Sequence, residues 1–211
     1  MSNKVGVIGL GAMGSGMAGS LRRAGFDTAV FDIRTEVAQA FAKEGGTACA
    51  SLAELGARCD VIVSVVVNAA QTESVLFGAD GCAASMKRGS VFVMCSTVDP
   101  NWSIALEARL AALGILYIDA PISGGAAKAA SGQMTMMTAA SSEAYAKAGD
   151  MLDAMAAKVY RLGDKAGAGS KVKIINQLLA GVHIAVAAEA MALGLREGVE
   201  ASALYEVITN S

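Results

Sequence analysis

The sequence of 211 residues predicts an α/β protein: a doubly wound parallel sheet, followed by a long helix that begins an all-helical region. Three observations predict it. Continuously apolar, strand-like runs alternate with helical patterns, which is typical of a parallel sheet covered by helices on both faces. A glycine-rich turn joins the first strand to the first helix. The alternation stops near Gly163, after which the chain is helical and apolar nearly all round.

The strands and helices follow one another in a regular order. The expected strands are short runs rich in β-branched residues, at 5–8, 28–31, 61–67, 90–95 and 115–118. The expected helices between them include 12–24, 35–44 and 101–113, and Gly25 ends the first of these as a C-cap. Met134, Met136 and Met137 alternate in a further strand and are expected to pack in the core.

The change of pattern near Gly163 predicts two parts. We expect residues 1–162 to form the sheet domain, and residues 163–211 to form an interdomain helix and the start of a truncated all-α domain. The long helix should run from Ser170 to about Arg196, and a second helix from Glu200 to Thr209. A helix that is apolar nearly all round needs cover on every side. We therefore expect either further chain or a second subunit, in a homo-oligomer, to cover it.

Composition and charge exclude several classes of protein. Hydrophobic residues are 54% of the chain and charged residues 17%, which excludes a disordered chain. The net charge is −2 with no basic run, so nucleic acid is not an expected partner. One His and four Cys without C-x-x-C spacing predict no metal site, and unpaired thiols indicate a cytoplasmic protein. The longest apolar run, 178–188, is shorter than the roughly 20 residues of a membrane span, so no membrane partner is expected.

The glycine-rich turn has the G-x-G-x-x-G spacing of a Rossmann-type dinucleotide site, in which backbone N–H groups at the helix start receive the phosphates. Its residues are Gly9, Leu10, Gly11, Ala12, Met13 and Gly14. Asp32 ends the second strand, where a carboxylate can accept hydrogen bonds from ribose hydroxyls and repels a 2′-phosphate. This favours NAD over NADP as the cofactor. Arg34 could hold such a phosphate, so NADP stays as the weaker alternative.

Two further elements can serve a substrate. Ser123, Gly124 and Gly125 follow a strand and offer a hydroxyl and free N–H groups to a carboxylate, although an ordinary loop would look the same. On the long helix, Asn176 and Gln177 lie about 60° and 40° from Lys173, so the three form one polar patch. A buried lysine beside an alcohol can act as general acid and base. The alternative is a solvated lysine near a helix start.

Together these motifs resemble the β-hydroxyacid dehydrogenase family, which includes 3-hydroxyisobutyrate dehydrogenase. The resemblance lies in residues 7–18, in 119–125 (DAPISGG) and in 167–176 (GAGSKVKIIN). It implies NAD-dependent oxidation of a short hydroxy acid with Lys173 as the catalytic lysine. By the same resemblance, the substrate is bound by Ser123, Gly124, Gly125 and Asn176. Gln177 is a further candidate for substrate binding, because it belongs to the polar patch of the long helix. The cofactor is lined by residues 9–14, Asp32, Val66, Val67 and Thr97.

Within the family, residues 66–81, 119–137 and 158–193 are most similar to the group that oxidises L-threonate at C2 to the 2-oxo acid. Asn176 stands where that group often has His. Oxidation of 3-hydroxyisobutyrate, or reduction of a related semialdehyde or 2-oxo acid, is therefore an alternative. Family members continue as an all-helical domain that closes over the nicotinamide, so we expect the helical region here to be incomplete. A non-catalytic dinucleotide-binding fragment is the other alternative.

Overall fold

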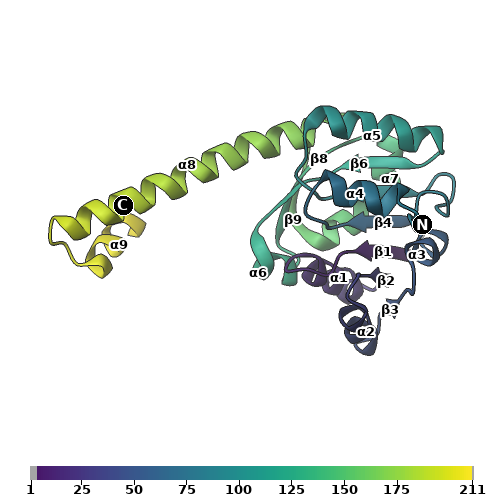
Figure 1. The fold of residues 1–211 in the computed structure, drawn as a ribbon, viewed down its shortest axis with the longest axis horizontal. Helices are drawn as coiled ribbons and strands as arrows, with labels where there is room; N and C mark the ends of the chain where they lie inside the picture. The colour runs from purple at the N-terminus through teal and green to yellow at the C-terminus, as the bar shows by residue number, and fades with distance from the viewer. Residues whose placement is uncertain (1–3, 211) are drawn as a thin grey trace. The chain divides into compact units, whose positions relative to one another are not determined.

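The computed structural model describes residues 4–210, which divide into two units, one ending at Lys173 and one beginning at Ile174. The first unit holds a 9-stranded sheet with helices packed on it (Figure 1). Its strands are β1 Lys4–Ile8, β2 Asp27–Phe31, β3 Thr47–Ala48, β4 Val61–Ser64, β5 Val91–Met94, β6 Leu116–Asp119, β7 Ile122–Ser123, β8 Met134–Ala140 and β9 Ala156–Arg161. Its helices are α1 Gly14–Arg23, α2 Thr35–Lys43, α3 Leu52–Arg58, α4 Ala69–Phe77, α5 Pro100–Ala112, α6 Gly125–Ala130 and α7 Ser142–Met155.

The parallel strands lie in the order β3-β2-β1-β4-β5-β6. The last residues of the five main strands are in register, because Ile8 pairs with Phe31 and Ser64, Met94 pairs with Ser64, and Asp119 pairs with Met94. Every loop that leaves these strands therefore starts at one edge of the sheet, the edge where doubly wound sheets bind ligands.

The expected strands pair in parallel, and the strands after β6 make the whole sheet mixed. β8 runs antiparallel to β6 and β7, while β9 runs parallel to β8. After β6 the chain stays at the carboxyl edge through β7 and the short helix α6. Because no crossover returns the chain to the opposite edge, β8 enters the sheet in the reverse direction.

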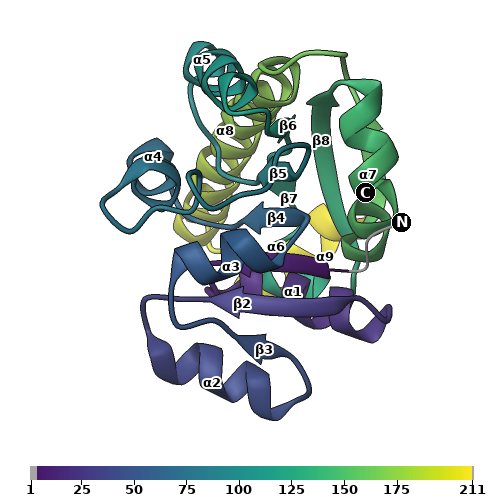
Figure 2. The same cartoon turned by 90° about the vertical axis from the view of Figure 1, so that its right-hand side faces the viewer.

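Alternate residues of each central strand face two helical layers. Val61 and Val63 of β4 join a core cluster with α1, α2 and α7, whereas Ile62 joins a second cluster with α3, α4 and α5. Figure 2 shows α7 and α4 on opposite sides of the strands and α2 beside the edge strand β3. The strands are buried on both faces, which explains why their sequences are continuously apolar rather than alternating.

The strand expected at 61–67 is shorter, because β4 ends at Ser64. Just beyond it, Val65 still donates its N–H to the Ile8 carbonyl of β1 (2.8 Å). Side chains hold the next two residues: Val67 donates its N–H to Gln71 Oε1 (2.8 Å), and the Val66 carbonyl accepts from Ser96 Oγ (2.7 Å). The expected helices at 12–24, 35–44 and 101–113 are confirmed as α1, α2 and α5, within two residues at each end.

The second unit consists of the rest of α8 (Ala168–Arg196) and of α9 (Ala201–Asn210). Its apolar side chains are exposed in the single chain; Leu178, for example, is 67% exposed. The burial that the sequence predicted for this helix is therefore not provided within residues 4–210. Within residues 4–210, α8 has 29 residues and could cross a membrane, judged by its length and composition alone. This corrects the argument that the apolar run 178–188 is too short, because the helix extends well beyond that run.

Close packing of α1 on α6 gives a stability prediction. A Cβ at Gly16 would lie 2.6 Å from Ala130 N and 2.7 Å from Ala129 C, both backbone atoms of α6. We expect Gly16→Ala to lower the free energy of unfolding by about 1–3 kcal/mol in urea denaturation, since the backbones must move apart. Gly19→Ala in the same helix is the control, because its Cβ meets only the flexible end of Arg23. Equal stability of the two variants would contradict this packing.

Candidate functional site

The glycine-rich turn between β1 and α1 combines tight packing with an open space. Gly9 has φ +88°, and a Cβ there would lie 2.6 Å from the Val65 carbonyl oxygen. A Cβ at Gly14 would overlap the carbonyl oxygen of Gly9, whereas a Cβ at Gly11 would meet no atom within 4 Å. In the part of the chain that the structure describes, no side chain caps the first turn of α1. The turn can therefore receive a phosphate at Gly11 and at the helix N-terminus.

Asp32 follows β2 and is only 7% exposed. Its Oδ2 accepts a hydrogen bond from the Leu10 N–H (2.6 Å), which ties the carboxylate to the glycine-rich turn. Its Oδ1 accepts from the backbone N–H of Arg34 (2.9 Å) and from Arg34 Nε (3.1 Å). Burial raises the pKa of Asp32, but the hydrogen bonds from Arg34 and Leu10 outweigh it, so the net pKa is lowered. The carboxylate is thus held ionised beside the turn.

The glycine-rich turn and Asp32 border a cavity of about 450 Å³. Five of the residues expected to bind the cofactor line it together: Gly9, Gly11, Asp32, Val66 and Val67. Leu52 and Val75 add an apolar wall. A carboxylate, exposed glycine backbone and apolar walls in one cavity fit the adenosine part of a dinucleotide.

The other residues expected at the cofactor lie outside the lining of this cavity. Within the turn, Leu10 is buried, Ala12 is exposed and Met13 is half-buried. Gly14 is buried at the start of α1. Thr97 is exposed on the loop that follows β5.

A chain of buried hydroxyls links the loops after β4 and β5. Ser96 Oγ lies 3.2 Å from Thr72 Oγ1 and donates to the Val66 carbonyl, while Thr72 Oγ1 donates to the Asn68 carbonyl (3.0 Å). Ser96 is 2% exposed and Thr72 is fully buried. No motif in the sequence points to either residue, because a hydroxyl residue near a strand end or in a helix has no distinctive pattern. Together they fix the loop that brings Val66 and Val67 to the cavity.

Lys173 lies in the second turn of α8 and is 6% exposed, and its burial lowers its pKa. Lys171, two residues earlier, is exposed. The first turn of α8 is held by the buried carboxylate of Asp119, which accepts hydrogen bonds from the backbone N–H groups of Gly167 and Ser170 (both 2.9 Å). The chain therefore provides a desolvated amine close to the carboxyl edge of the sheet, where a neutral lysine can exchange a proton with a substrate.

The turn expected to bind a carboxylate follows β6 at the same edge. Ser123 is half-buried in β7, and Gly124 and Gly125 are exposed. Gly124 has φ +139° and Gly125 has φ +75°, backbone angles that residues other than glycine rarely adopt. A Cβ at Gly125 would meet nothing within 4 Å, so the backbone there is open to a ligand.

Asn176 and Gln177 belong to the second unit. Both follow Lys173 on α8; Asn176 is half-buried and Gln177 is exposed.

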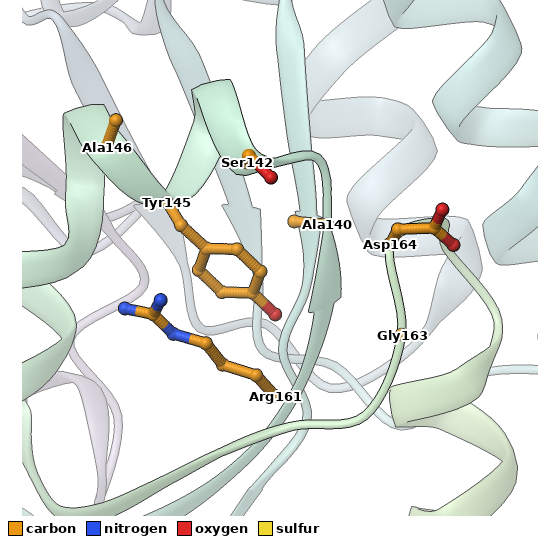
Figure 3. A pocket seen from close by; sticks show the side chains of 7 residues that line it. All are labelled: Ala140, Ser142, Tyr145, Ala146, Arg161, Gly163 and Asp164. Atoms are coloured by element: carbon orange, nitrogen blue, oxygen red, sulfur yellow. The ribbon is translucent and has the colours of Figure 1, made fainter.

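A second cavity, of about 480 Å³, lies between β8, α7 and the end of β9 (Figure 3). The Arg161 guanidinium lies over the Tyr145 ring, 4.5 Å from its centroid, and the Tyr145 hydroxyl is 2.8 Å from Thr138 Oγ1. None of the residues expected to bind cofactor or substrate lines this cavity. Its central polar groups contact one another, which is typical of a structural cluster.

Two family models cover the chain. The model described as the NAD binding domain of 6-phosphogluconate dehydrogenase matches residues 4–163. The model described as NAD-binding of NADP-dependent 3-hydroxyisobutyrate dehydrogenase matches residues 167–211.

Individual proteins are similar over nearly the whole chain. The L-threonate dehydrogenase of Cupriavidus necator is 64% identical over 211 residues, which are 100% of this chain and 71% of that protein. The L-threonate dehydrogenase of Escherichia coli K12 is 44% identical over 98% of this chain and 69% of its own length. A crystal structure of 3-hydroxyisobutyrate dehydrogenase from Salmonella typhimurium superposes with a TM-score of 0.92 at 47% identity, covering 98% of this chain and 72% of that one.

The open space at Gly11 can be tested directly. We expect Gly11→Ala to weaken NADH binding at least tenfold, about 1.4 kcal/mol, because the methyl group would occupy the space that a phosphate must enter. The free energy of unfolding should change by less than about 0.5 kcal/mol, since no atom lies within 4 Å of the new Cβ. NADH fluorescence titration and urea denaturation measure the two effects. Unchanged affinity would remove Gly11 from the binding site.

The buried hydroxyls of Ser96 and Thr72 give a second prediction, which separates NADH affinity from stability by means of a control variant. Ser96→Ala leaves the Val66 carbonyl without its donor, so we expect a loss of about 1–2 kcal/mol of stability and weaker NADH binding. Ser103→Ala is the matched control, since it removes an equally buried hydroxyl that contacts Tyr117 Oη at 2.9 Å on another element. The control should lose stability without losing affinity in the same titration. Equal affinities of the two variants would contradict a role of Ser96 in holding the loop.

Proposed function

This chain belongs to the 3-hydroxyisobutyrate dehydrogenase-like family of NAD-binding hydroxy acid dehydrogenases, and on that premise we propose that it oxidises L-threonate at C2 to the 2-oxo acid. The observation that carries the proposal is the 64% identity to an L-threonate dehydrogenase across the whole chain. The buried amine of Lys173 supports it, because that oxidation needs a base at the hydroxyl that loses its proton.

NAD would be held by the glycine-rich turn, by Asp32 and by the loop of Val66 and Val67, with Thr97 on the neighbouring loop. Gly11 would leave room for the pyrophosphate, and Asp32 would accept hydrogen bonds from the ribose hydroxyls. When bound, the cofactor supplies the acceptor for the hydride that leaves C2. NAD is preferred over NADP because the ionised Asp32 carboxylate would repel a 2′-phosphate.

Lys173 takes the proton of the C2 hydroxyl. The proton passes from the hydroxyl oxygen to the Nζ lone pair, and the O–H electron pair forms the second bond of C2=O. The hydrogen on C2 leaves with its electron pair as hydride. Burial lowers the pKa of Lys173, so its neutral form is present at a lower pH than for a solvated lysine. Ser123, Gly124 and Gly125 are assigned to the substrate carboxylate. Asn176 and Gln177 are assigned to its hydroxyls from their sequence positions alone, three and four residues after Lys173.

We further assign residues 1–162 to an NAD-binding domain and residues 163–211 to an interdomain helix and the start of an all-α domain.

The exposed apolar side chains of α8 and α9 support a homo-oligomer in which protein covers them. His183 and Glu189 interrupt the apolar surface of α8, which supports protein rather than lipid as its surroundings. All four cysteines are free and buried, as suits a cytoplasmic protein.

Lys173→Ala tests the proposed base. With L-threonate and NAD, we expect NADH formation at 340 nm to fall by about 10²–10⁴-fold, because the proton acceptor is lost, while NADH binding stays within twofold.

In the unaltered chain, the oxidation rate should rise with pH as Lys173 loses its proton. The apparent pKa of this rise should lie below the ordinary lysine value of about 10.4.

Lys171→Ala is the control, since it removes an exposed lysine two residues away. Equal activity of the two variants would contradict the assignment of the base. Faster turnover of 3-hydroxyisobutyrate than of L-threonate would contradict the proposed substrate.

A further inference from the structure

Asp119 is the last residue of β6 and is fully buried. Its Oδ2 accepts hydrogen bonds from the N–H groups of Gly167 and Ser170 at 2.9 Å, and its Oδ1 accepts from Ser170 Oγ at 2.7 Å. Free N–H groups at a helix start need acceptors, and a carboxylate there also meets the positive end of the helix dipole. Here that acceptor comes from a strand about 50 residues earlier, not from a neighbouring residue of the chain.

The start of α8 packs closely against the sheet. A Cβ at Gly169 would overlap the Met137 carbonyl oxygen and lie 2.9 Å from the Asp119 carbonyl oxygen. Ser170 is fully buried. The first turn of α8 is thus fixed from two sides, by the backbones of β6 and β8 and by the Asp119 carboxylate.

Lys173 follows Ser170 by three residues, so the two side chains lie on the same face of the helix. Both are buried, whereas Lys171 is exposed. The position that buries Lys173 therefore depends on the first turn of α8. The strand that holds this turn through Asp119 also leads, four residues later, into Ser123 and the two glycines after it.

We propose that Asp119 is a positioning residue: its carboxylate anchors the first turn of α8 and so places the Lys173 amine at the edge where the substrate turn begins. The proposal rests on the proposed function of Lys173. Asp119 acts through Ser170 and the helix backbone. An amide is a weaker anchor, because it carries no negative charge for the helix start and has only one accepting oxygen, so its NH₂ group would have to donate to Ser170 Oγ, which now donates.

Lysine labelling tests the anchor independently of activity. Brief treatment with acetic anhydride, followed by peptide mass spectrometry, gives the labelling of Lys173 relative to Lys171 in the same molecules. We expect a low ratio in the unaltered chain and at least a fivefold rise in Asp119→Asn, because the released turn lets water and reagent reach Lys173. Ser103→Ala, a buried hydroxyl lost elsewhere, should leave the ratio unchanged.

The same variant separates positioning from cofactor binding. In Asp119→Asn, kcat for NADH formation should fall at least tenfold, while NADH affinity stays within twofold. A folded Asp119→Asn protein with an unchanged labelling ratio would overturn the proposal. If that variant does not fold, Ser170→Ala removes one of the three hydrogen bonds and should raise the ratio at least twofold; an unchanged ratio there would equally overturn it. Full activity of Lys173→Ala would reject the catalytic role of the lysine, whatever the labelling shows about the anchor.

Discussion

The register of the parallel strands is the constraint on which the rest of the site depends. Ile8, Phe31, Ser64, Met94 and Asp119 end five strands at one level of the sheet. The glycine-rich turn, Asp32, the two hydroxyl-linked loops and the substrate turn therefore all begin at the same edge. A shift of one residue in any pair would exchange the side chains that pack in the two core clusters, so the packing of these clusters keeps the strand ends aligned.

At this edge, buried polar groups join segments that are distant in sequence. Asp32 accepts from Leu10, Ser96 donates to the Val66 carbonyl, and Asp119 accepts from Ser170. Each bond satisfies a backbone group that a loop would otherwise leave unpaired in the protein interior. The loops around the site are thus fixed by side chains that do not themselves need to touch a ligand.

Local patterns in the sequence predict the parts of this arrangement that are local. Apolar runs give the strands, and the G-x-G-x-x-G spacing with Asp32 gives the nucleotide turn. The reversed direction of β8 and the partners of Asp119 and Ser96 are not predicted. They depend on which strands lie side by side, and one sequence does not contain that information. Helical angles in the sequence place Lys173 beside Asn176 and Gln177, whereas the burial that distinguishes Lys173 from Lys171 comes from the contact of α8 with the sheet.

The bond between β6 and the start of α8 also has a consequence for the order of folding. About 50 residues of chain must close into a loop before Asp119 can reach Ser170, and such distant contacts form slowly because the entropy of the loop opposes them. The chain is made from its N-terminus, so the residues of the glycine-rich turn and of the strands beside it exist before Ser170 does. A newly made chain can therefore have a complete glycine-rich turn before it has a placed base.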